Sequence, residues 1–249
     1  MLRKVTAIRY VAPLREGGSL PALVEADDDG LYVVKFRGAG QGMLALVAEV
    51  VAGEMARAVG LPVPEIVLVE IGDDLVTAEP DPEIQALVQG SAGLNVGLDF
   101  LPGSLMYSPA AGFHVAPDLA AAVIWLDSLV ENVDRTPRNP NLLTWHDRLW
   151  LIDHGAALYR SHWGLDPSVA RRPFAPVREH VLLPEAYSVS EADARLAPLL
   201  GPDVIQTVVE SVPPSWMVRP SAERYASYLT ARLEEPRGFV DEAERARGD

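Results

Sequence analysis

Residues 132–155 read "NVDRTPRNPNLLTWHDRLWLIDHG" and combine polar clusters with two short strand-like runs. The runs "LLTW" and "LWLI" are rich in β-forming residues, and the three residues "HDR" between them predict a β-hairpin. If the runs pair symmetrically about Asp147, Asn141 faces Asp153 across the two strands. The sequence therefore predicts that an amide and a carboxylate project together from the open end of this hairpin.

Further oxygen donors lie just before the hairpin. Asn139 precedes Asn141, and Asp134 opens the Pro-containing loop that follows an apolar helical segment. An isolated aspartate in such a turn is most often a cap. However, Asp134, an asparagine and Asp153 follow one another in the order and spacing that phosphoryl transfer requires, and amide and carboxylate oxygens suit Mg²⁺. These residues are therefore the candidate catalytic and metal-binding groups, with the choice between the two asparagines open.

A lysine and a glutamate stand in apolar surroundings. Only two of the 21 basic residues are lysines, Lys4 and Lys35, and Lys35 shares a strand face of "LYVVKF" with apolar residues. The helical segment 43–59 is apolar on nearly every side yet contains Glu49. A buried charge needs a partner, so we expect Lys35 to pair with Glu49. The alternatives are that both charges reach water, or that Glu54 competes from another helix face.

The composition excludes several classes of protein. The 249 residues contain no cysteine, which removes a disulfide framework, a thiolate zinc site and a cysteine nucleophile. With 35 acidic and 21 basic residues, the net charge of −14 argues against direct nucleic-acid binding. The start of the chain does not resemble a secretory signal and no apolar run could span a bilayer, so we expect a cytoplasmic protein without membrane contact.

The order of expected elements indicates an α+β fold. A β-rich N-terminal part with one main helix is followed by a Gly- and Pro-rich connector and a mostly helical remainder. The last residues are highly charged, and we expect them to fray. The expected strands are residues 5–11, 19–26, 30–36 and 64–71; the expected helices are 41–60, 82–90, 118–130, 177–183, 190–200, 203–212 and 221–235; the connector is 94–104 and the frayed tail 236–249.

These motifs, taken together, resemble the HipA-like kinases. The resemblance rests on "AEVVAGEMARAVGLPVPE" and "NVDRTPRN", and on a strand lysine, a helix glutamate and an aspartate-x-glycine motif in this order. It spans about residues 14–158 and implies a bilobal protein-kinase-like fold: a β-rich N-lobe (1–96), a hinge (97–103) and a helical C-lobe (104–249). The length implies a short form without the additional N-terminal region of HipA toxins. His154 replaces the usual phenylalanine of the metal motif.

The resemblance also implies a role for each candidate residue. Lys35, held by Glu49, would neutralise ATP phosphates, and Asp134 would orient or deprotonate the acceptor hydroxyl. Asp153 would bind Mg²⁺ with an asparagine: Asn139 has the family's spacing from Asp134, whereas the hairpin favours Asn141. The backbone of Asp99, Phe100 and Leu101 would meet adenine, and Gly17, Gly18 and Ser19 would cover the phosphates.

The resulting expectation is an ATP- and Mg²⁺-dependent phosphotransferase. A Ser/Thr hydroxyl of a protein is the first acceptor to consider, and a small-molecule hydroxyl is the main alternative, because the same residues serve both. A second alternative is a nucleotide-binding pseudokinase that acts as a regulatory or partner-binding module. The joint presence of Lys35, Glu49, Asp134 and Asp153 argues against it.

Overall fold

A computed structural model gives the fold, in which every expected strand and every expected helix except 177–183 is present at least in part. It describes residues 1–14, 20–39, 42–72, 75, 81–159, 164–217 and 219–248. The strands are β1 (Arg3–Pro13), β2 (Ala22–Ala26), β3 (Leu31–Lys35), β4 (Ile66–Ile71), β5 (Gly93–Asp99), β6 (Leu105–Met106), β7 (Leu142–Trp145) and β8 (Arg148–Leu151). The α-helices are α1 (Met43–Ala58), α2 (Pro82–Gln89), α3 (Pro117–Leu129), α4 (Val189–Leu196), α5 (Pro202–Glu210), α6 (Ala222–Leu233) and α7 (Gly238–Gly248). Short 3₁₀ helices are η1 (Pro109–Ala111), η2 (Pro167–Val169), η3 (Ala175–Glu179), η4 (Leu183–Glu185), η5 (Ala197–Leu199) and η6 (Pro214–Trp216).

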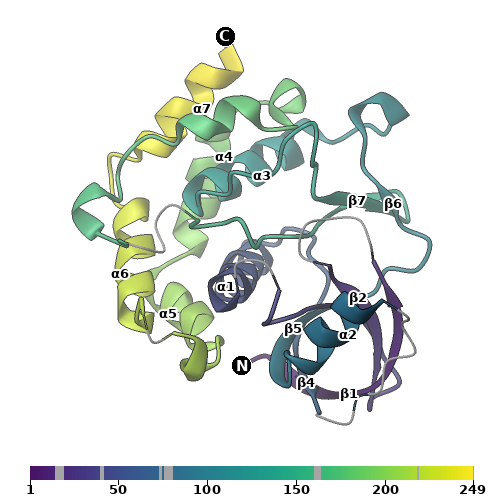
Figure 1. The fold of residues 1–249 in the computed structure, drawn as a ribbon. Helices are drawn as coiled ribbons and strands as arrows, with labels where there is room; N and C mark the ends of the chain where they lie inside the picture. Colours follow the sequence, from purple (N-terminus) through teal and green to yellow (C-terminus); the bar gives the residue numbers. More distant parts are fainter. Residues whose placement is uncertain are drawn as a thin grey trace.

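The N-terminal strands form a closed barrel in the order β1-β2-β3-β5-β4 (Figure 1). Neighbouring strands are antiparallel except for β1 and β4, whose parallel pairing closes the barrel. β1 carries two irregularities in its pairing with β2, which bend and twist a long strand so that it can pair on both sides. The barrel has its own apolar interior, with Val24, Val34 and Val67 completely buried.

The expected extended connector 94–104 is a barrel strand in its first part, since residues 94–99 belong to β5. This strand lies between β3 and β4 in the barrel. Both of its faces are buried: Val96 and Leu98 pack toward α1, whereas Asn95 and Gly97 face the other way. The Asn95 amide is satisfied by the backbone, accepting from Arg37 N–H at 2.8 Å. A strand buried on both faces, with glycine and asparagine in it, lacks the alternation that identifies a strand in sequence.

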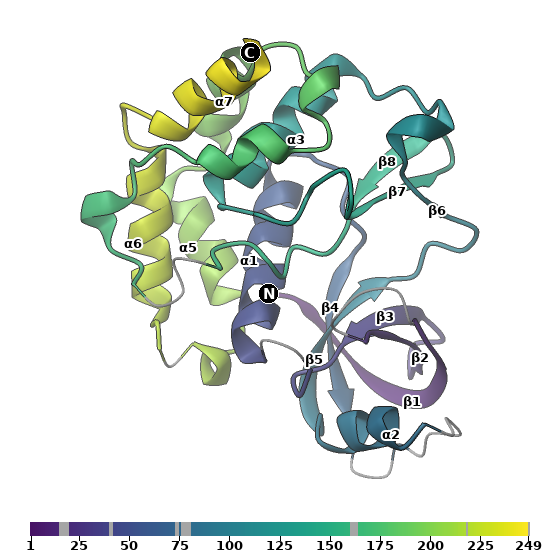
Figure 2. The same cartoon turned by 45° about the horizontal axis from the view of Figure 1, so that its top comes forward.

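Helix α1 lies between the barrel and the helical part of the molecule (Figures 1 and 2). One side packs against β4 and β5, and the other packs against α5 and η6. Val47, Val50 and Val51 are completely buried and belong to the same apolar cluster as α3 to α7. Burial from both sides explains why the sequence of this helix is apolar on nearly every face.

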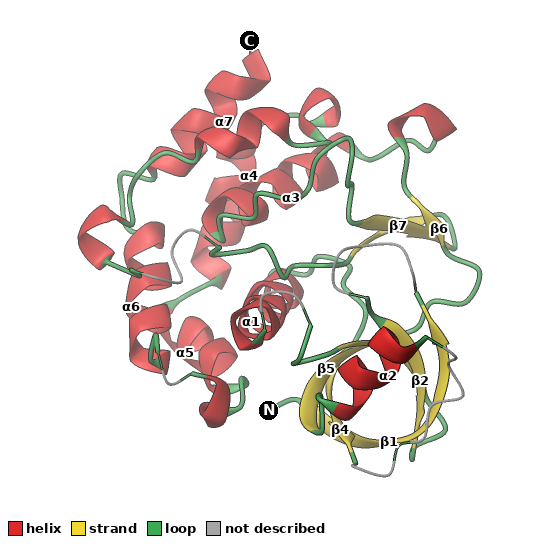
Figure 3. Cartoon of the chain, viewed as in Figure 1, coloured by secondary structure: helices red, strands yellow, loops and turns green. Residues whose placement is uncertain are grey.

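Helices α3 to α7 gather on the side of the molecule away from the barrel, whereas α2 lies against the barrel (Figure 3). α3 is the central one, and Trp125 in its middle is completely buried. None of the helices in the described part of the chain is long and apolar enough to cross a lipid bilayer.

Two expectations for the C-terminal half are wrong. Residues 177–183 were expected to be helical, but the segment forms η3 and η4, separated by an extended His180 (ψ 129°). Proline occupies the first turn of each 3₁₀ helix. Because proline has no N–H and its ring clashes with the preceding turn, one continuous helix cannot run through these positions.

The expected frayed tail is helix α7. Its charged residues alternate with an apolar face, on which Phe239 and Ala243 are completely buried. The Phe239 ring lies 6.3 Å from that of Trp125 in α3. Packing of two aromatic residues thus holds a segment that its charge alone would leave in solvent.

The expected hairpin is present, but its pairing differs by one residue. β7 and β8 pair with Trp145 opposite Arg148, so the connection is the two residues His146 and Asp147. Both have left-handed φ angles, 47° and 57°, as a type I′ turn requires. This turn matches the right-handed twist of the strands.

The corrected pairing places Asn141 opposite Ile152 rather than Asp153. The Ile152 N–H donates to the Asn141 carbonyl at 3.1 Å. The predicted face-to-face arrangement of Asn141 and Asp153 is therefore wrong, because a one-residue shift exchanges the two faces of a strand pair.

Gly97 provides a test of the barrel interior. A Cβ atom there would lie 2.6 Å from Cγ2 of Val69 and 3.1 Å from Cγ2 of Val67. We predict that Gly97→Ala lowers the free energy of unfolding by about 1–3 kcal/mol through overpacking, measured by urea denaturation. Gly164→Ala, where a Cβ meets nothing within 4 Å, is the control. Equal stability of both variants would contradict the tight interior.

Candidate active site

Lys35 connects three elements through its ammonium group. The side chain leaves the end of β3, and its Nζ donates to Oε2 of Glu49 in α1 and to Oδ1 of Asp153 after β8, both at 2.5 Å. Lys35 is only 9% exposed and Glu49 is completely buried. The expected Lys35–Glu49 pair is thus confirmed, while Glu54 pairs instead with Arg57 at 3.2 Å.

The charges of this cluster stabilise one another. Burial alone lowers the pKa of Lys35, but the adjacent carboxylates of Glu49 and Asp153 outweigh burial and raise that pKa above its ordinary value. The ammonium in turn lowers the pKa of Asp153, although burial acts in the opposite direction. Lys35 therefore stays protonated and Asp153 ionised at neutral pH.

Asp134 lies on the loop after α3 and is held by both asparagines. Nδ2 of Asn139 donates to Oδ2 of Asp134 at 2.8 Å. Nδ2 of Asn141 donates to the same oxygen at 3.3 Å and to the Asp134 carbonyl at 3.2 Å. Burial and the nearby charge of Asp153 raise the pKa of Asp134, while the two amides partly offset this. The result is an oriented carboxylate with increased affinity for a proton.

Backbone strain coincides with the site. Asn141 and Asp153, on the segments just before β7 and just after β8, both have left-handed φ angles, 49° and 54°. Asparagine and aspartate tolerate this conformation better than other non-glycine residues, and such positions are often functional. The side chains are thereby directed toward Asp134 and Lys35 rather than along the strand faces.

These residues line a cavity of about 990 Å³. Lys35, Asp134 and Asp153 lie on its walls together with residues 98–101 of the predicted hinge region. Nε1 of Trp145 in β7 donates to the Pro102 carbonyl at 2.9 Å and so holds the residues that follow 98–101 against the hairpin. The structure brings together the following predicted site residues along this cavity: Lys35, Asp99, Phe100, Leu101, Asp134, Asn139, Asn141 and Asp153. Gly17, Gly18 and Ser19, predicted to cover the phosphates, lie outside the described residues.

The donor set fits a hard cation only in combination with other oxygens. Within the described ranges, no three His, Asp or Glu side chains form a cluster that could hold a metal by themselves. Nζ of Lys35 donates to Oδ1 of Asp153, and both asparagines donate from Nδ2 to Asp134. Oδ2 of Asp153 and the side-chain amide oxygens of the asparagines therefore remain able to bind a cation. One carboxylate and an amide completed by phosphate oxygens is a donor set that Mg²⁺ accepts.

A buried network beneath the site fixes the loop that carries Asp134. Asp127 of α3 is 1% exposed and accepts from Nε of Arg135 at 2.5 Å, from Nε2 of His180 at 2.9 Å and from Nδ2 of Asn132 at 3.0 Å. Nδ1 of His180 accepts from Leu182 N–H, which places the ring proton on Nε2. Arg135 outweighs burial and keeps the pKa of Asp127 well below its usual range.

Arg135 also satisfies the backbone of the hairpin ends. Its Nη1 donates to the carbonyl of Asn141 and, at 3.3 Å, to that of Ile152. Nη2 lies 3.4 Å from Nδ1 of His154, next to Asp153. One guanidinium thus joins the loop of Asp134 to the segment of Asp153, so that the two carboxylates are positioned by a common support.

This support is not apparent from the sequence motifs. Asp127 carried a usable signal, since a carboxylate in the middle of an apolar helical segment requires a buried partner. His180 carried none, because it lies 53 residues from Asp127 and its segment was expected to be a helix.

His154 makes the stability of the folded chain depend on pH. Burial, with Arg135 as the second cause, lowers its pKa from 6.5 to about 3, so the folded chain resists protonation that the unfolded chain accepts. Stability from this group is complete above pH 6.5 and is lost as the pH falls toward 3. We predict that His154→Phe reduces the loss of unfolding free energy between about pH 7 and 5 by about 2 kcal/mol, measured by urea denaturation.

The exposed His114 supplies the control, since His114→Phe changes a side chain that is solvated in the folded chain. His180, whose pKa is lowered chiefly by burial, retains a dependence of the same sign in His154→Phe. An unchanged pH dependence in His154→Phe would contradict a neutral, buried His154.

Comparison with known proteins shows which family and which solved structures this chain is similar to. A model of the HipA-like kinase family matches residues 7–235, well beyond the span of the sequence motifs. No curated protein is detectably similar in sequence. Among solved structures, the chain is similar to the Helicobacter pylori proinflammatory kinase CtkA, with a TM-score of 0.56 and 15% identity over 99% of this chain and 98% of that chain.

Golgi casein kinase structures are similar as well. One gives a TM-score of 0.55 at 13% identity, covering 100% of this chain and 75% of that chain. Another, with Mn/ADP bound, gives 0.52 at 13% identity, covering 99% and 74%. At this identity the likeness shows the fold alone, which is kinase-like and α+β as predicted.

Proposed function

Because the chain belongs to the HipA-like kinase family, we propose that it is an ATP- and Mg²⁺-dependent phosphotransferase acting on a Ser/Thr hydroxyl of a protein. The observation that carries this proposal is the position of Lys35, whose ammonium lies between Glu49 and Asp153 on the wall of a cavity that also contains Asp134. A buried cation with an adjacent metal-type carboxylate and a separate oriented carboxylate suits transfer of a phosphoryl group.

The nucleotide would lie along the larger cavity. Adenine would meet the backbone of residues 97–103, which we propose as the hinge between an N-lobe (1–96) and a C-lobe (104–249). Phe100 N–H is already bonded to the Leu31 carbonyl at 2.9 Å. Leu101 N–H makes no such bond within the described residues, which leaves it available to a ring nitrogen of adenine. Lys35 would then face the α- and β-phosphates.

The other site residues would each have a separate role in the transfer. Asp153, with Asn139 or Asn141, would hold Mg²⁺, which when bound neutralises developing charge on the phosphate oxygens. Glu49 keeps Lys35 from turning away. Asp134 accepts the proton of the acceptor hydroxyl while the hydroxyl oxygen bonds to the γ-phosphorus, the bond from that phosphorus to the β-phosphate oxygen breaks, and ADP leaves.

Asp134 provides the test of catalysis. We predict that Asp134→Asn lowers phosphate transfer from Mg·ATP by about 10²–10⁴-fold, because the proton acceptor is lost, while ATP still raises the melting temperature. Incorporated phosphate is measured by intact mass and ADP by chromatography. Asp147→Asn, the same change in the exposed hairpin turn, is the matched control.

ATP-dependent stabilisation of the wild type without phosphate transfer or ADP formation would instead indicate a nucleotide-binding module. Absence of any effect of ATP would contradict both functions. Asp153→Asn, measured beside these variants, should abolish the dependence of ATP affinity on Mg²⁺.

The two lysines of the chain give a matched pair for nucleotide binding. We predict that Lys35→Arg weakens ATP affinity at least about tenfold, because a planar guanidinium cannot occupy the compact position between two carboxylates. Lys4→Arg changes an exposed lysine that pairs with Glu70, and ATP affinity should not change. Affinities are measured by calorimetric titration of Mg·ATP. Equal affinities in the two variants would remove Lys35 from the nucleotide site.

A further inference from the structure

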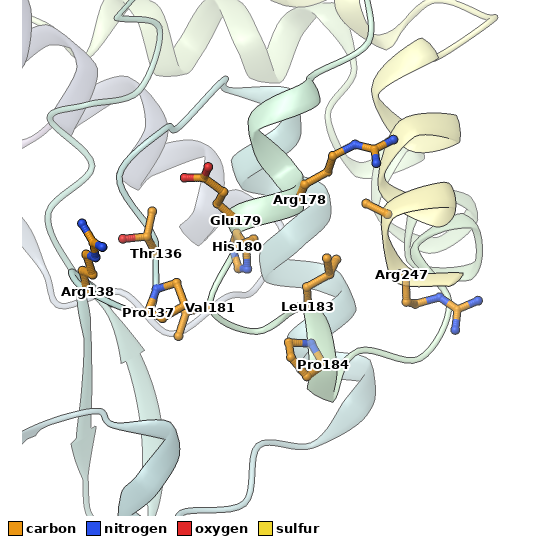
Figure 4. Close-up of a pocket in the computed structure, with 11 residues that line it drawn as sticks. Thr136, Pro137, Arg138, Arg178, Glu179, His180, Val181, Leu183, Pro184 and Arg247 are labelled. Carbon is orange, nitrogen blue, oxygen red and sulfur yellow. The ribbon is translucent and has the colours of Figure 1, made fainter. Parts of the chain in front are cut away.

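A second cavity of about 690 Å³ lies beside the loop that follows Asp134 (Figure 4). Residues 136–138 of this loop form one wall. The segment from η3 to η4 and the end of α7 form the opposite walls. Its volume is within the roughly 300–1,000 Å³ of ligand sites.

Arg138 belongs to both cavities. Among the described residues it is the one that lines the second cavity and also the larger cavity of Asp134 and Lys35. Its side chain is exposed and forms no hydrogen bond or ion pair with the described part of the chain. It follows Asp134 by four residues, and both residues line the larger cavity.

The other charged residues of the second cavity have different positions. Arg178 and Arg247 point away from the loop in Figure 4 and pair with α7 carboxylates: Arg178 with Glu242 at 3.1 Å and Arg247 with Glu244 at 3.0 Å. Glu179 lies on η3 and points toward the loop. Arg138 is thus the cation at the junction whose charge no described carboxylate neutralises.

The lining also has an apolar part, made by Pro137, Val181, Leu183 and Pro184 (Figure 4), of which Leu183 and Pro184 are accessible to solvent. Thr136 and His180 add polar groups beside it. This apolar part suits the uncharged side chains of an extended peptide, while the charged residues of the lining remain for its polar ones.

We propose that this second cavity is the acceptor site and that Arg138 selects a serine or threonine peptide with an acidic residue beside the reactive hydroxyl. Two observations carry this proposal: Arg138 lines both cavities, and no described carboxylate neutralises its charge. With a net charge of −14, the protein as a whole repels an acidic segment, so a local cation must supply the attraction. The inference rests on the proposed phosphotransferase function.

Pools of short serine peptides test it. In each pool one position flanking the serine is fixed as Asp, Ala or Arg, and phosphate incorporation from Mg·ATP is measured. The wild type should prefer Asp over Ala at one or more adjacent positions by about tenfold, as expected for one charge-assisted hydrogen bond. Arg138→Gln should bring this ratio close to one, and Arg138→Glu should favour Arg at the same position.

Glu179→Gln is the matched control, because it removes a charge of opposite sign from the same cavity and should retain the preference for Asp. The ratio of pools is unaffected by a general loss of rate, and melting temperatures verify that the variants fold. If Arg138 variants lower the rates of all pools equally, the residue acts on the transferred phosphate and the proposal is wrong.

The wild type separates this inference from the function on which it rests. ADP formation or self-phosphorylation without phosphate on any pool would overturn the peptide site and leave the phosphotransferase in place. Absence of ADP formation and of stabilisation by ATP would overturn both.

Discussion

The buried ammonium of Lys35 is the constraint around which the molecule is arranged. It requires carboxylates from two other elements, Glu49 of α1 and Asp153 after β8, because a charge removed from water without partners destabilises the fold by several kcal/mol. Meeting that requirement brings together the barrel, helix α1 and the segment after the hairpin. The cavity walls follow from this arrangement, since β3 and the chain after β8 must face each other across the space beside α1.

A second set of buried charges fixes the irregular backbone beside this cavity. At the ends of the hairpin, the Ile152 carbonyl lies beyond the last strand pair and the Asn141 carbonyl accepts from Ile152 N–H, so both can take a further donor. Arg135 supplies that donor to both carbonyls, while Asp127 neutralises its charge. The loop of Asp134 and the segment of Asp153, to which we assign proton acceptance and metal binding, are therefore both anchored to α3 through Asp127 and Arg135.

Some of this arrangement was accessible from the sequence for definite reasons. Lys35 and Glu49 stood out because each is charged in an apolar segment, and pairing is the solution that avoids an isolated buried charge. β5 did not stand out, because burial on both faces removes alternation, and α7 did not because charged residues flank its apolar face. The hairpin was found but its pairing was not, since the left-handed angles of His146 and Asp147 are not those that these residue types usually adopt.

The sequence by itself determined the residue types of the site, their order and the elements that carry them, because helix and strand periodicity and the need to pair buried charges act within or between short segments. Only the tertiary structure decided which of these groups meet. The closure of the barrel, the one-residue shift that separates Asn141 from Asp153 and the contact of His180 with Asp127 all depend on long-range packing. Such contacts are selected by the fit of the whole core and of its buried polar groups, for which no local pattern exists.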